Sequence, residues 1–260
     1  MSYLDEVFGL QGKTAVVTGG GQGIGQVVAV GLAKAGAEII IVCRHGADET
    51  IRLIEEVGGK AYYEPCDVTK EDQVDKCVAS IVARSGKIDI LFNNAGVCYH
   101  KGIFEATIED WREVIDINLT GEYIMARAVI RTMIDKGIQG SIINMASMSG
   151  TIVNIPQWQA AYNASKAGII HLTKSLAIEM AHNGYDIRVN ALSPGYVATP
   201  MSVDPDFVEP ELIENWTRLM PTGRMAKPEE LVPAVLYMVS PMAGYTNGAD
   251  TIVDGAYSVQ

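Results

Sequence analysis

Three residues could together perform acid–base chemistry: Tyr162, Lys166 and Ser147. Tyr162 and Lys166 stand four positions apart in a segment of helical spacing, so their side chains share one face of the predicted helix. An ammonium close to a phenol favours the phenolate and lowers the phenol pKa toward the range useful for proton transfer. Ser147 follows a predicted strand and adds a hydroxyl. A Tyr–Lys pair at this spacing usually lies on a solvent-exposed helix face without a catalytic role. The prediction of acid–base chemistry therefore depends on the neighbouring motifs.

A glycine-rich turn is the first of these motifs. Residues 18–25 read TGGGQGIG and lie between the first predicted strand and a predicted helix. Glycines in such a turn allow a tight bend, a close approach of the backbone to a pyrophosphate and close packing of helix on strand. The spacing differs from G-x-G-x-x-G, and a glycine-rich turn alone is a weak signal. Its position predicts a dinucleotide site, with contacts from Gly19, Gln22, Gly23, Ile24 and Gly25.

The end of the second predicted strand indicates which dinucleotide is bound. An acidic residue there would bind the ribose 2′-hydroxyl of NAD, whereas a basic residue would accept the 2′-phosphate of NADP. Residues 42–45 read VCRH, with no carboxylate, and Arg44 can pair with a phosphate. An arginine at the end of a strand is also a common surface feature. We therefore expect a preference for NADP, with NAD as the alternative.

Short apolar runs alternate with helical segments along the chain, and these elements would position the motifs. The expected strands cover residues 14–17, 39–42, 61–63, 88–92, 141–145, 187–191 and 251–253. The expected helices cover residues 25–35, 50–56, 71–83, 111–134, 160–182 and 228–239. Continuous apolar strands separated by helices indicate an α/β fold with a parallel sheet that is covered on both faces. The carboxyl ends of such strands are where a ligand binds.

Composition excludes several other classes of protein. With 20 basic and 31 acidic residues in 260, the net charge is −11, which disfavours binding to nucleic acid or to an anionic membrane surface. The four cysteines lack C-x-x-C spacing, so neither a zinc site nor a redox motif is indicated, and we expect no metal. The first residues do not resemble a secretory signal, and no apolar run is long enough for a membrane helix. We expect a cytoplasmic protein.

One segment interrupts the alternation of strands and helices. The chain from about residue 200 to residue 222 is acidic and contains several prolines and short helical runs. Residues 1–260 are expected to form a single domain, in which this segment is an insertion after the sixth strand. Because it follows the carboxyl end of a strand, it is placed to act as a lid over the site. A surface excursion without function is the alternative.

The combined motifs resemble the short-chain dehydrogenase/reductase family over nearly the whole chain. They are the turn at residues 18–25, DV at 67–68, NNAG at 93–96, Asn118, Ser147, YNASK at 162–166 and PGYVAT at 194–199. The resemblance implies a Rossmann-type, doubly wound sheet of seven parallel strands, usually in a homotetramer packed partly through the two long helices. It also implies that a nicotinamide dinucleotide carries the hydride.

The resemblance further implies a role for each matching residue. Tyr162 would donate or accept the proton, Ser147 would hydrogen-bond the substrate oxygen, and Lys166 would hold the nicotinamide ribose and lower the pKa of Tyr162. Asn118 would keep a water that links Lys166 to solvent. The other residues implied to bind the dinucleotide are Asp67 and Val68 beside adenine, Asn94, Ala95 and Gly96 along the adenosine and ribose, and Pro194, Gly195, Val197 and Thr199 around the carboxamide.

The substrate is expected to be a polyol or the corresponding ketose. Residues 135–143 and the general pattern resemble family members that act on such sugars, and polar side chains precede the helix that carries Tyr162. We expect Gln157, Trp158 and Gln159 to face the substrate, with packing as the alternative role for Trp158. The alternatives are a 3-oxoacyl-thioester reductase, a general carbonyl or steroid reductase, and a regulatory protein that senses NADP(H). The acidic segment disfavours an acidic acyl-carrier partner and lacks the apolar character expected of a steroid lid.

Overall fold

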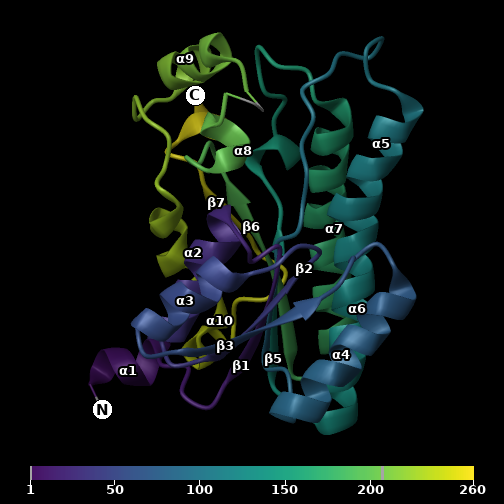
Figure 1. Cartoon of the computed structure of the whole chain (residues 1–260), viewed down its shortest axis with the longest axis vertical. Coiled ribbons are helices and arrows are strands. Elements are labelled where there is room, and N and C mark those ends of the chain that lie inside the picture. Colours follow the sequence, from purple (N-terminus) through teal and green to yellow (C-terminus); the bar gives the residue numbers. More distant parts are fainter. Residues whose placement is uncertain (1, 206–207) are drawn as a thin grey trace.

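Seven parallel strands form the central sheet of the computed structural model, which describes residues 2–205 and 208–260 (Figure 1). Their order across the sheet is β3-β2-β1-β4-β5-β6-β7. The chain therefore starts in the middle of the sheet, builds one edge, and crosses back to build the other, as in a doubly wound fold. The prediction of a seven-stranded parallel sheet is confirmed. The strands are β1 (Thr14–Thr18), β2 (Glu38–Cys43), β3 (Lys60–Pro65), β4 (Ile90–Asn93), β5 (Gly140–Met145), β6 (Ile187–Pro194) and β7 (Asp250–Val253).

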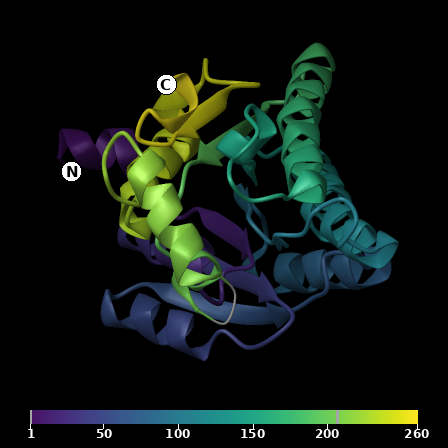
Figure 2. The ribbon, with the colours of Figure 1, turned by 90° about the horizontal axis from the view of Figure 1, so that it is seen from above.

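Helices cover both faces of this sheet (Figures 1 and 2). One face carries α2 (Gly23–Lys34), α3 (Asp48–Glu56) and α10 (Val232–Val239). The other carries α4 (Glu71–Ser85), α6 (Glu122–Lys136) and α7 (Ala160–His182). The remaining helices are α1 (Tyr3–Phe8), α5 (Ile108–Ile115), α8 (Pro200–Val203) and α9 (Pro210–Leu219).

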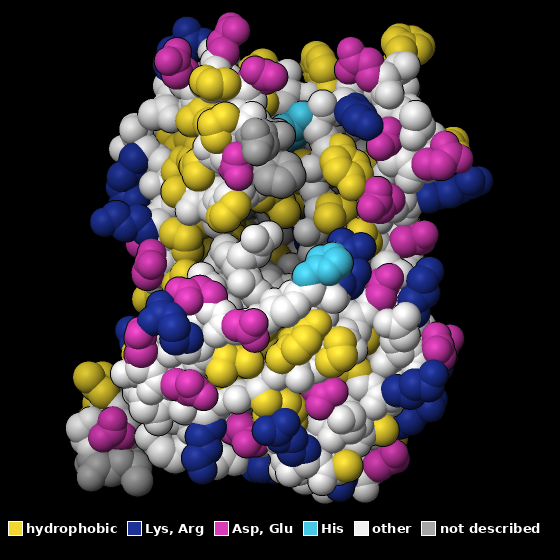
Figure 3. Space-filling view, viewed as in Figure 1, with side chains coloured by type: hydrophobic (Ala, Val, Ile, Leu, Met, Phe, Trp, Pro, Cys, Tyr) yellow, Lys and Arg dark blue, Asp and Glu magenta, His cyan; other side chains and the backbone are white. Residues whose placement is uncertain are grey.

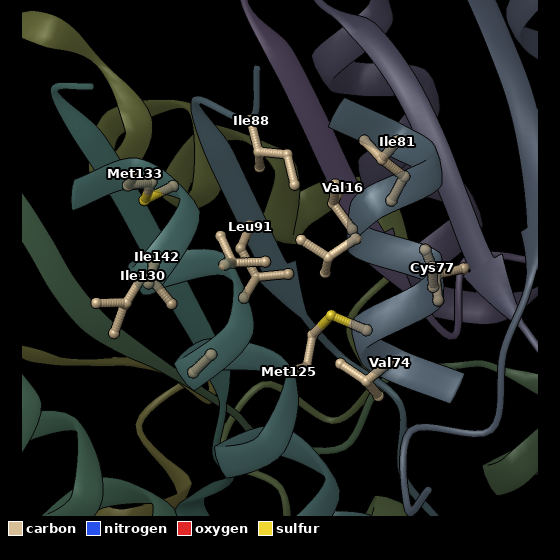
Figure 4. Close-up of a cluster of buried hydrophobic side chains, with 14 of the residues drawn as sticks. Val16, Val74, Cys77, Ile81, Ile88, Leu91, Met125, Ile130, Met133 and Ile142 are labelled. Atoms are coloured by element: carbon tan, nitrogen blue, oxygen red, sulfur yellow. The ribbon is translucent and has the colours of Figure 1, made fainter. Parts of the chain in front are cut away.

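Each face of the sheet has its own apolar core. Because successive side chains of a strand point to opposite faces, Ile40 of β2 belongs to the core under α4 and α6, whereas Ile41 belongs to the core under α2 and α10. Figure 4 shows the first core, where Leu91 of β4 lies among Val74 of α4 and Met125 of α6. Burial on both faces explains why the strands are continuous apolar runs in the sequence.

Among the predicted elements, the helix expected over residues 111–134 differs most from the structure. It consists of α5, a π-helical segment (Asp116–Gly121) and α6, which follow one another without a break in the helical backbone. Asn118 lies inside the π-helical segment, where its side chain bonds to the backbone of Val97. The apolar periodicity could not show this change, since π-helical turns occur as short insertions, frequently at functional sites. The capped helix α1 was also not predicted.

The insertion after β6 forms a small apolar core of its own. Trp216 of α9 and Met220, directly after this helix, pack with Met148, Val208 and Tyr257, so the face of α9 directed toward the domain is apolar. The acidic residues of α9 and its N-cap lie on the exposed face. The acidic composition of residues 200–222 therefore describes the exposed face of this segment, and the face that packs on the rest of the protein is more apolar than expected. Residues 206–207 of the expected lid lie outside the described residues. Among the described helices, none is long and apolar enough to cross a membrane.

Candidate functional site

A cavity of about 520 Å³ opens at the carboxyl ends of the strands. Figure 3 shows a hollow on this face of the molecule, with hydrophobic side chains gathered around it. Of the residues predicted for the site, those that line the cavity are Gly19, Gln22, Gly23, Ile24, Arg44, Asp67, Val68, Asn94, Ala95, Gly96, Ser147, Gln157, Gln159, Tyr162, Lys166, Pro194, Gly195, Val197 and Thr199. Gly25, Asn118 and Trp158 do not line it.

The glycine-rich turn forms one wall of the cavity with its backbone. Gly19 and Gly23 have φ values of 64° and 58°, a region that favours glycine. A Cβ at Gly23 would project toward Thr199 on the opposite side, 3.7 Å away, so a side chain there would occupy the cavity. Helix α2 begins at Gly23 and directs its free N–H groups toward this space. These features fit the pyrophosphate of a dinucleotide.

Gly25 and Asn94 support this turn from behind. A Cβ at Gly25 would lie 2.5 Å from the carbonyl oxygen of Gly19, so this glycine permits close packing and makes no contact with the cavity. The side-chain amide of Asn94 donates to the carbonyl oxygens of Thr18 at 3.0 Å and Gly19 at 3.3 Å. The hydroxyl of Thr18 accepts from the backbone N–H groups of Asn94 and Ala95. The sequence motifs at β1 and β4 therefore stabilise one another.

Arg44 and Asp67 lie at the end of the cavity beyond β2 and β3. Arg44 is exposed, so its guanidinium is available to a ligand in the cavity. Burial raises the pKa of Asp67, but hydrogen bonds from Thr69 and the charges of Arg44 and Lys70 more than offset this and lower it overall. The carboxylate accepts from the Thr69 backbone N–H at 3.0 Å and from its hydroxyl at 2.8 Å. Asp67 is therefore ionised at neutral pH, and Arg44 supplies a positive charge near it.

Tyr162, Lys166 and Ser147 converge at the other end of the cavity, as their spacing predicted. The Lys166 Nζ lies 5.8 Å from the centre of the Tyr162 ring. Burial raises the pKa of the Tyr162 phenol, negative charge at Glu122 adds to this rise, and a hydrogen bond with Ser147 opposes it. The net shift of the Tyr162 pKa is therefore upward, and a lowering by Lys166 stays a prediction.

Lys166 also has partners other than Tyr162. Its ammonium donates to the carbonyl oxygen of Met145 at 2.5 Å and lies 3.3 Å from Oε1 of Glu122. Both charged side chains are buried, with 2% and 1% of their surface exposed. Glu122 was missed by the sequence analysis, because no local pattern shows that an acid inside the helix expected over residues 111–134 is buried against Lys166, 44 positions later.

Asn118 does not line the cavity itself and bonds to the backbone of Val97, which does. It is fully buried, its Oδ1 accepts from the N–H of Val97 at 2.8 Å, and its Nδ2 donates to the carbonyl of Val97 at 2.9 Å. Its Nδ2 also lies 3.2 Å from the hydroxyl of Ser165. These bonds attach the helix bearing Lys166 to the loop after β4.

A polar network forms the wall below α9, and its members Tyr196 and Trp216 were not predicted to face the substrate. Gln157 donates to the phenol oxygen of Tyr196 at 2.8 Å and accepts from the indole N–H of Trp216 at 2.8 Å. Asn154 also donates to Tyr196, at 3.3 Å. The rings of Tyr196 and Trp216 are stacked, with centroids 4.7 Å apart. Tyr196 belongs to the PGYVAT motif, but no local signal links Trp216 to a residue 59 positions earlier.

Gln159 and Trp158 differ in their environment although they are adjacent. Gln159 is buried and donates to Ser149 and Asn154 at 3.2 Å and to Asn163 at 2.9 Å. Trp158 is 63% exposed and lies outside the cavity. The structure therefore brings Gln157 and Gln159 to the site and leaves Trp158 at the surface.

Known proteins with similar sequences and structures show what kind of protein has this site. The chain matches the profile of the family described as Enoyl-(Acyl carrier protein) reductase over residues 19–258. It is 43% identical to sorbose reductase of Candida albicans over 97% of this chain and 89% of that protein. It is 42% identical to a probable NADP-dependent mannitol dehydrogenase of Yarrowia lipolytica over 97% of this chain and 90% of that protein. A short-chain type dehydrogenase/reductase from Mycobacterium marinum is 40% identical with a TM-score of 0.92, over all of both chains.

The chain belongs to the short-chain dehydrogenase/reductase family. The predicted family, fold and enzyme class are thereby confirmed. As a short-chain dehydrogenase/reductase, the protein is an oxidoreductase that acts on a CH–OH group or the corresponding carbonyl. The cavity has the arrangement this activity needs, with a backbone cradle for a dinucleotide at one end and a phenol, a hydroxyl and an ammonium at the other.

Proposed function

We propose that the protein interconverts a polyol and its ketose, using NADP(H) as the hydride carrier. The polar wall made by Asn154, Gln157 and Tyr196 supports this proposal, because it presents several hydrogen-bonding groups beside Tyr162. A cavity with such groups favours a substrate rich in hydroxyls, which can form hydrogen bonds with them. The related sorbose reductase and mannitol dehydrogenase are named for such substrates.

In the proposed reaction, Tyr162 transfers the proton at the substrate oxygen. During ketose reduction the phenol donates its proton to the carbonyl oxygen, and during polyol oxidation the phenolate accepts the hydroxyl proton. Ser147 donates a hydrogen bond to the same oxygen and stabilises the charge that develops there. Lys166 supplies positive charge beside the phenol. Asn118 fixes the loop after β4 against α7 through its hydrogen bonds with Val97 and Ser165. The bound dinucleotide supplies or takes up the hydride.

The residues that would hold the dinucleotide follow the length of the cavity. The glycine-rich turn and the start of α2 would hold the pyrophosphate, and Asp67 and Val68 would lie beside the adenine. Asn94, Ala95 and Gly96 line the middle, and the backbone from Pro194 to Thr199 lines the nicotinamide end. The preference for NADP rests on Arg44, which is exposed at the adenosine end with no acid at the end of β2.

The segment from residue 200 to residue 222 is proposed to act as a lid over the substrate. Within it, Pro200, Met201, Ser202 and Trp216 line the cavity. Trp216 is joined to Gln157 by its indole N–H, so the position of α9 is linked to the polar wall. A lid connected in this way would exclude water from the reacting oxygen when a substrate is bound.

A homotetramer is proposed as the solution state. The helices α5, α6 and α7 expose large apolar side chains, among them Trp111 at 41%, Tyr123 at 43% and Ile178 at 72%. Apolar side chains gathered on one layer of helices are typical of a surface that other subunits cover.

A substrate panel tests the proposed function. Ketoses, polyols, sugar acids, an acetoacetyl thioester, a steroid ketone and small apolar ketones are assayed by nicotinamide absorbance. We expect the highest kcat/KM for a ketose or polyol of about five or six carbons, because its hydroxyls satisfy the polar wall. A tenfold higher kcat/KM for an apolar ketone, steroid or thioester would contradict the substrate class. Dinucleotide binding without turnover of any compound would favour the regulatory alternative.

A further inference from the structure

The carboxyl group of Glu122 lies directly behind Lys166, and the proposed reaction has not used it. Glu122 is the first residue of α6, and its side chain is 1% exposed. Oε1 lies 3.3 Å from the Lys166 Nζ, whereas Oε2 has no hydrogen-bond partner among the described residues. A buried carboxyl oxygen without a partner is costly, so its presence requires an explanation.

Helix capping does not explain Glu122. Helix α6 continues directly from the π-helical segment, and the backbone N–H of Glu122 is already bonded to the carbonyl of Leu119. The start of α6 therefore has no free N–H groups for an acid to satisfy. Other acids at helix starts in this protein, such as Glu49 and Glu71, are more than half exposed and pair with arginines.

The charge of the Glu122–Lys166 pair depends on one proton. The pair is neutral when the carboxylate is ionised and carries one positive charge when it is protonated. Burial raises the pKa of Glu122 to about 8, although the charge of Lys166, its hydrogen bond and the Met145 backbone oppose this. The carboxyl therefore changes its charge at about pH 8.

The other groups around the pair do not compete for this role. The Cys98 thiol is neutral, because burial raises its pKa to about 12. The strands packed on α6 present the amides of Asn93 and Asn144, which do not titrate; Asn93 donates to the Glu122 carbonyl at 2.7 Å. Helix α4 contributes apolar side chains and the Cys77 thiol, whose pKa is raised far above neutrality by a hydrogen bond with Cys66 and by burial. The acid Glu71 of α4 lies at the surface with Arg127.

We propose that Glu122 is a positioning residue that sets how much positive charge Lys166 presents to Tyr162. The ionised carboxylate cancels that charge and disfavours the phenolate. Binding of one solvent proton at Oε2 forms an O–H bond and leaves the full charge of Lys166 beside the phenol, with no oxidant or reductant involved. This inference rests on the proposed roles of Tyr162 and Lys166, which lie on the same side of α7.

The variant Glu122→Gln tests the inference through the pH profile of polyol oxidation. Oxidation needs the phenolate, so kcat/KM rises with pH as Tyr162 loses its proton. Removing the carboxylate removes a negative charge that raises the Tyr162 pKa, so the rising limb is expected at lower pH, by about one unit. Glu71→Gln, which neutralises a surface acid, is expected to leave the limb unchanged. Glu122→Met replaces the first variant if the amide does not fold.

Thermal unfolding without any dinucleotide gives a second readout. An acid whose pKa is raised in the folded state stabilises the protein below its unfolded value, near pH 4.5, and this stability is lost as the pH rises through about 8. The Tm of Glu122→Gln minus that of the unaltered protein is therefore expected to increase from pH 6 to pH 9, with a constant difference for Glu71→Gln.

Coincident pH profiles of Glu122→Gln and the unaltered protein would overturn the inference, and so would parallel Tm curves. Tyr162→Phe separates this failure from a failure of the proposed function. If Tyr162→Phe loses turnover while the Glu122→Gln profile matches that of the unaltered protein, only the inference fails. If Tyr162→Phe keeps most of its turnover, the proposed proton transfer fails, and the unfolding curves still decide whether Glu122 carries a pH-dependent charge.

Discussion

The two ends of the cavity are built in different ways. The dinucleotide end consists largely of backbone from single turns, such as residues 19–24, and this turn is supported by Asn94, which directly follows the neighbouring strand β4. The substrate end consists of side chains from segments far apart in the chain, as in the contacts among Gln157, Tyr196 and Trp216. A backbone cradle suits a ligand common to many enzymes, whereas a side-chain wall can change without disturbing it. The part of the cavity that binds the hydride carrier is therefore built separately from the part that selects the substrate.

Tyr162 lies where the two ends meet, and its loss should have the largest effect. Tyr162→Phe removes the hydroxyl that transfers the proton, so kcat is expected to fall by about 10²–10⁴-fold. The dissociation constant for NADPH, measured by fluorescence, is expected to stay nearly unchanged, because the backbone cradle is intact. A variant that keeps most of its kcat on the true substrate would show that another group is the acid.

Gln157 tests whether the substrate end acts independently. Gln157→Ala leaves the Trp216 N–H without its partner and removes one of the bonds to Tyr196, so KM for the polyol is expected to rise about tenfold. NADPH binding should be unaffected. The neighbouring Trp158→Ala is the control and should change KM less than twofold, since Trp158 is exposed outside the cavity. Equal changes of KM in the two variants would show that Gln157 does not contribute to substrate binding through the polar wall.

Arg44 tests the dinucleotide end, with the smallest expected change. Arg44→Ala is expected to lower kcat/KM for NADPH by about two- to tenfold, because an exposed charge contributes modestly. The value for NADH should not change, since NADH lacks the 2′-phosphate. Arg52→Ala, whose guanidinium pairs with Glu49 and Glu56 away from the cavity, is the control. Equal losses with both dinucleotides would show that Arg44 does not recognise the 2′-phosphate.

The sequence predicted the elements that bear the site motifs well, because the signals for these elements are local. The helix expected over residues 160–182 matches α7, and the spacing of Tyr162 and Lys166 places both at the cavity. The glycine-rich turn has the predicted position between β1 and α2. Predictions based on composition were weaker. The acidic character of residues 200–222 describes the exposed face of α9 and not the apolar face that bears Trp216.

By itself, the sequence determined the parallel sheet, the glycine cradle and the helix that carries Tyr162 and Lys166, since periodicity and spacing depend on neighbours along the chain. Only the tertiary structure decided three further features. It joined Trp216 to Gln157, placed Trp158 at the surface, and put Glu122 behind Lys166. The physical reason is that burial and charge pairing depend on which elements pack together. The pKa of Tyr162 therefore depends on α6 and α7 jointly, although the motif lies on α7 alone.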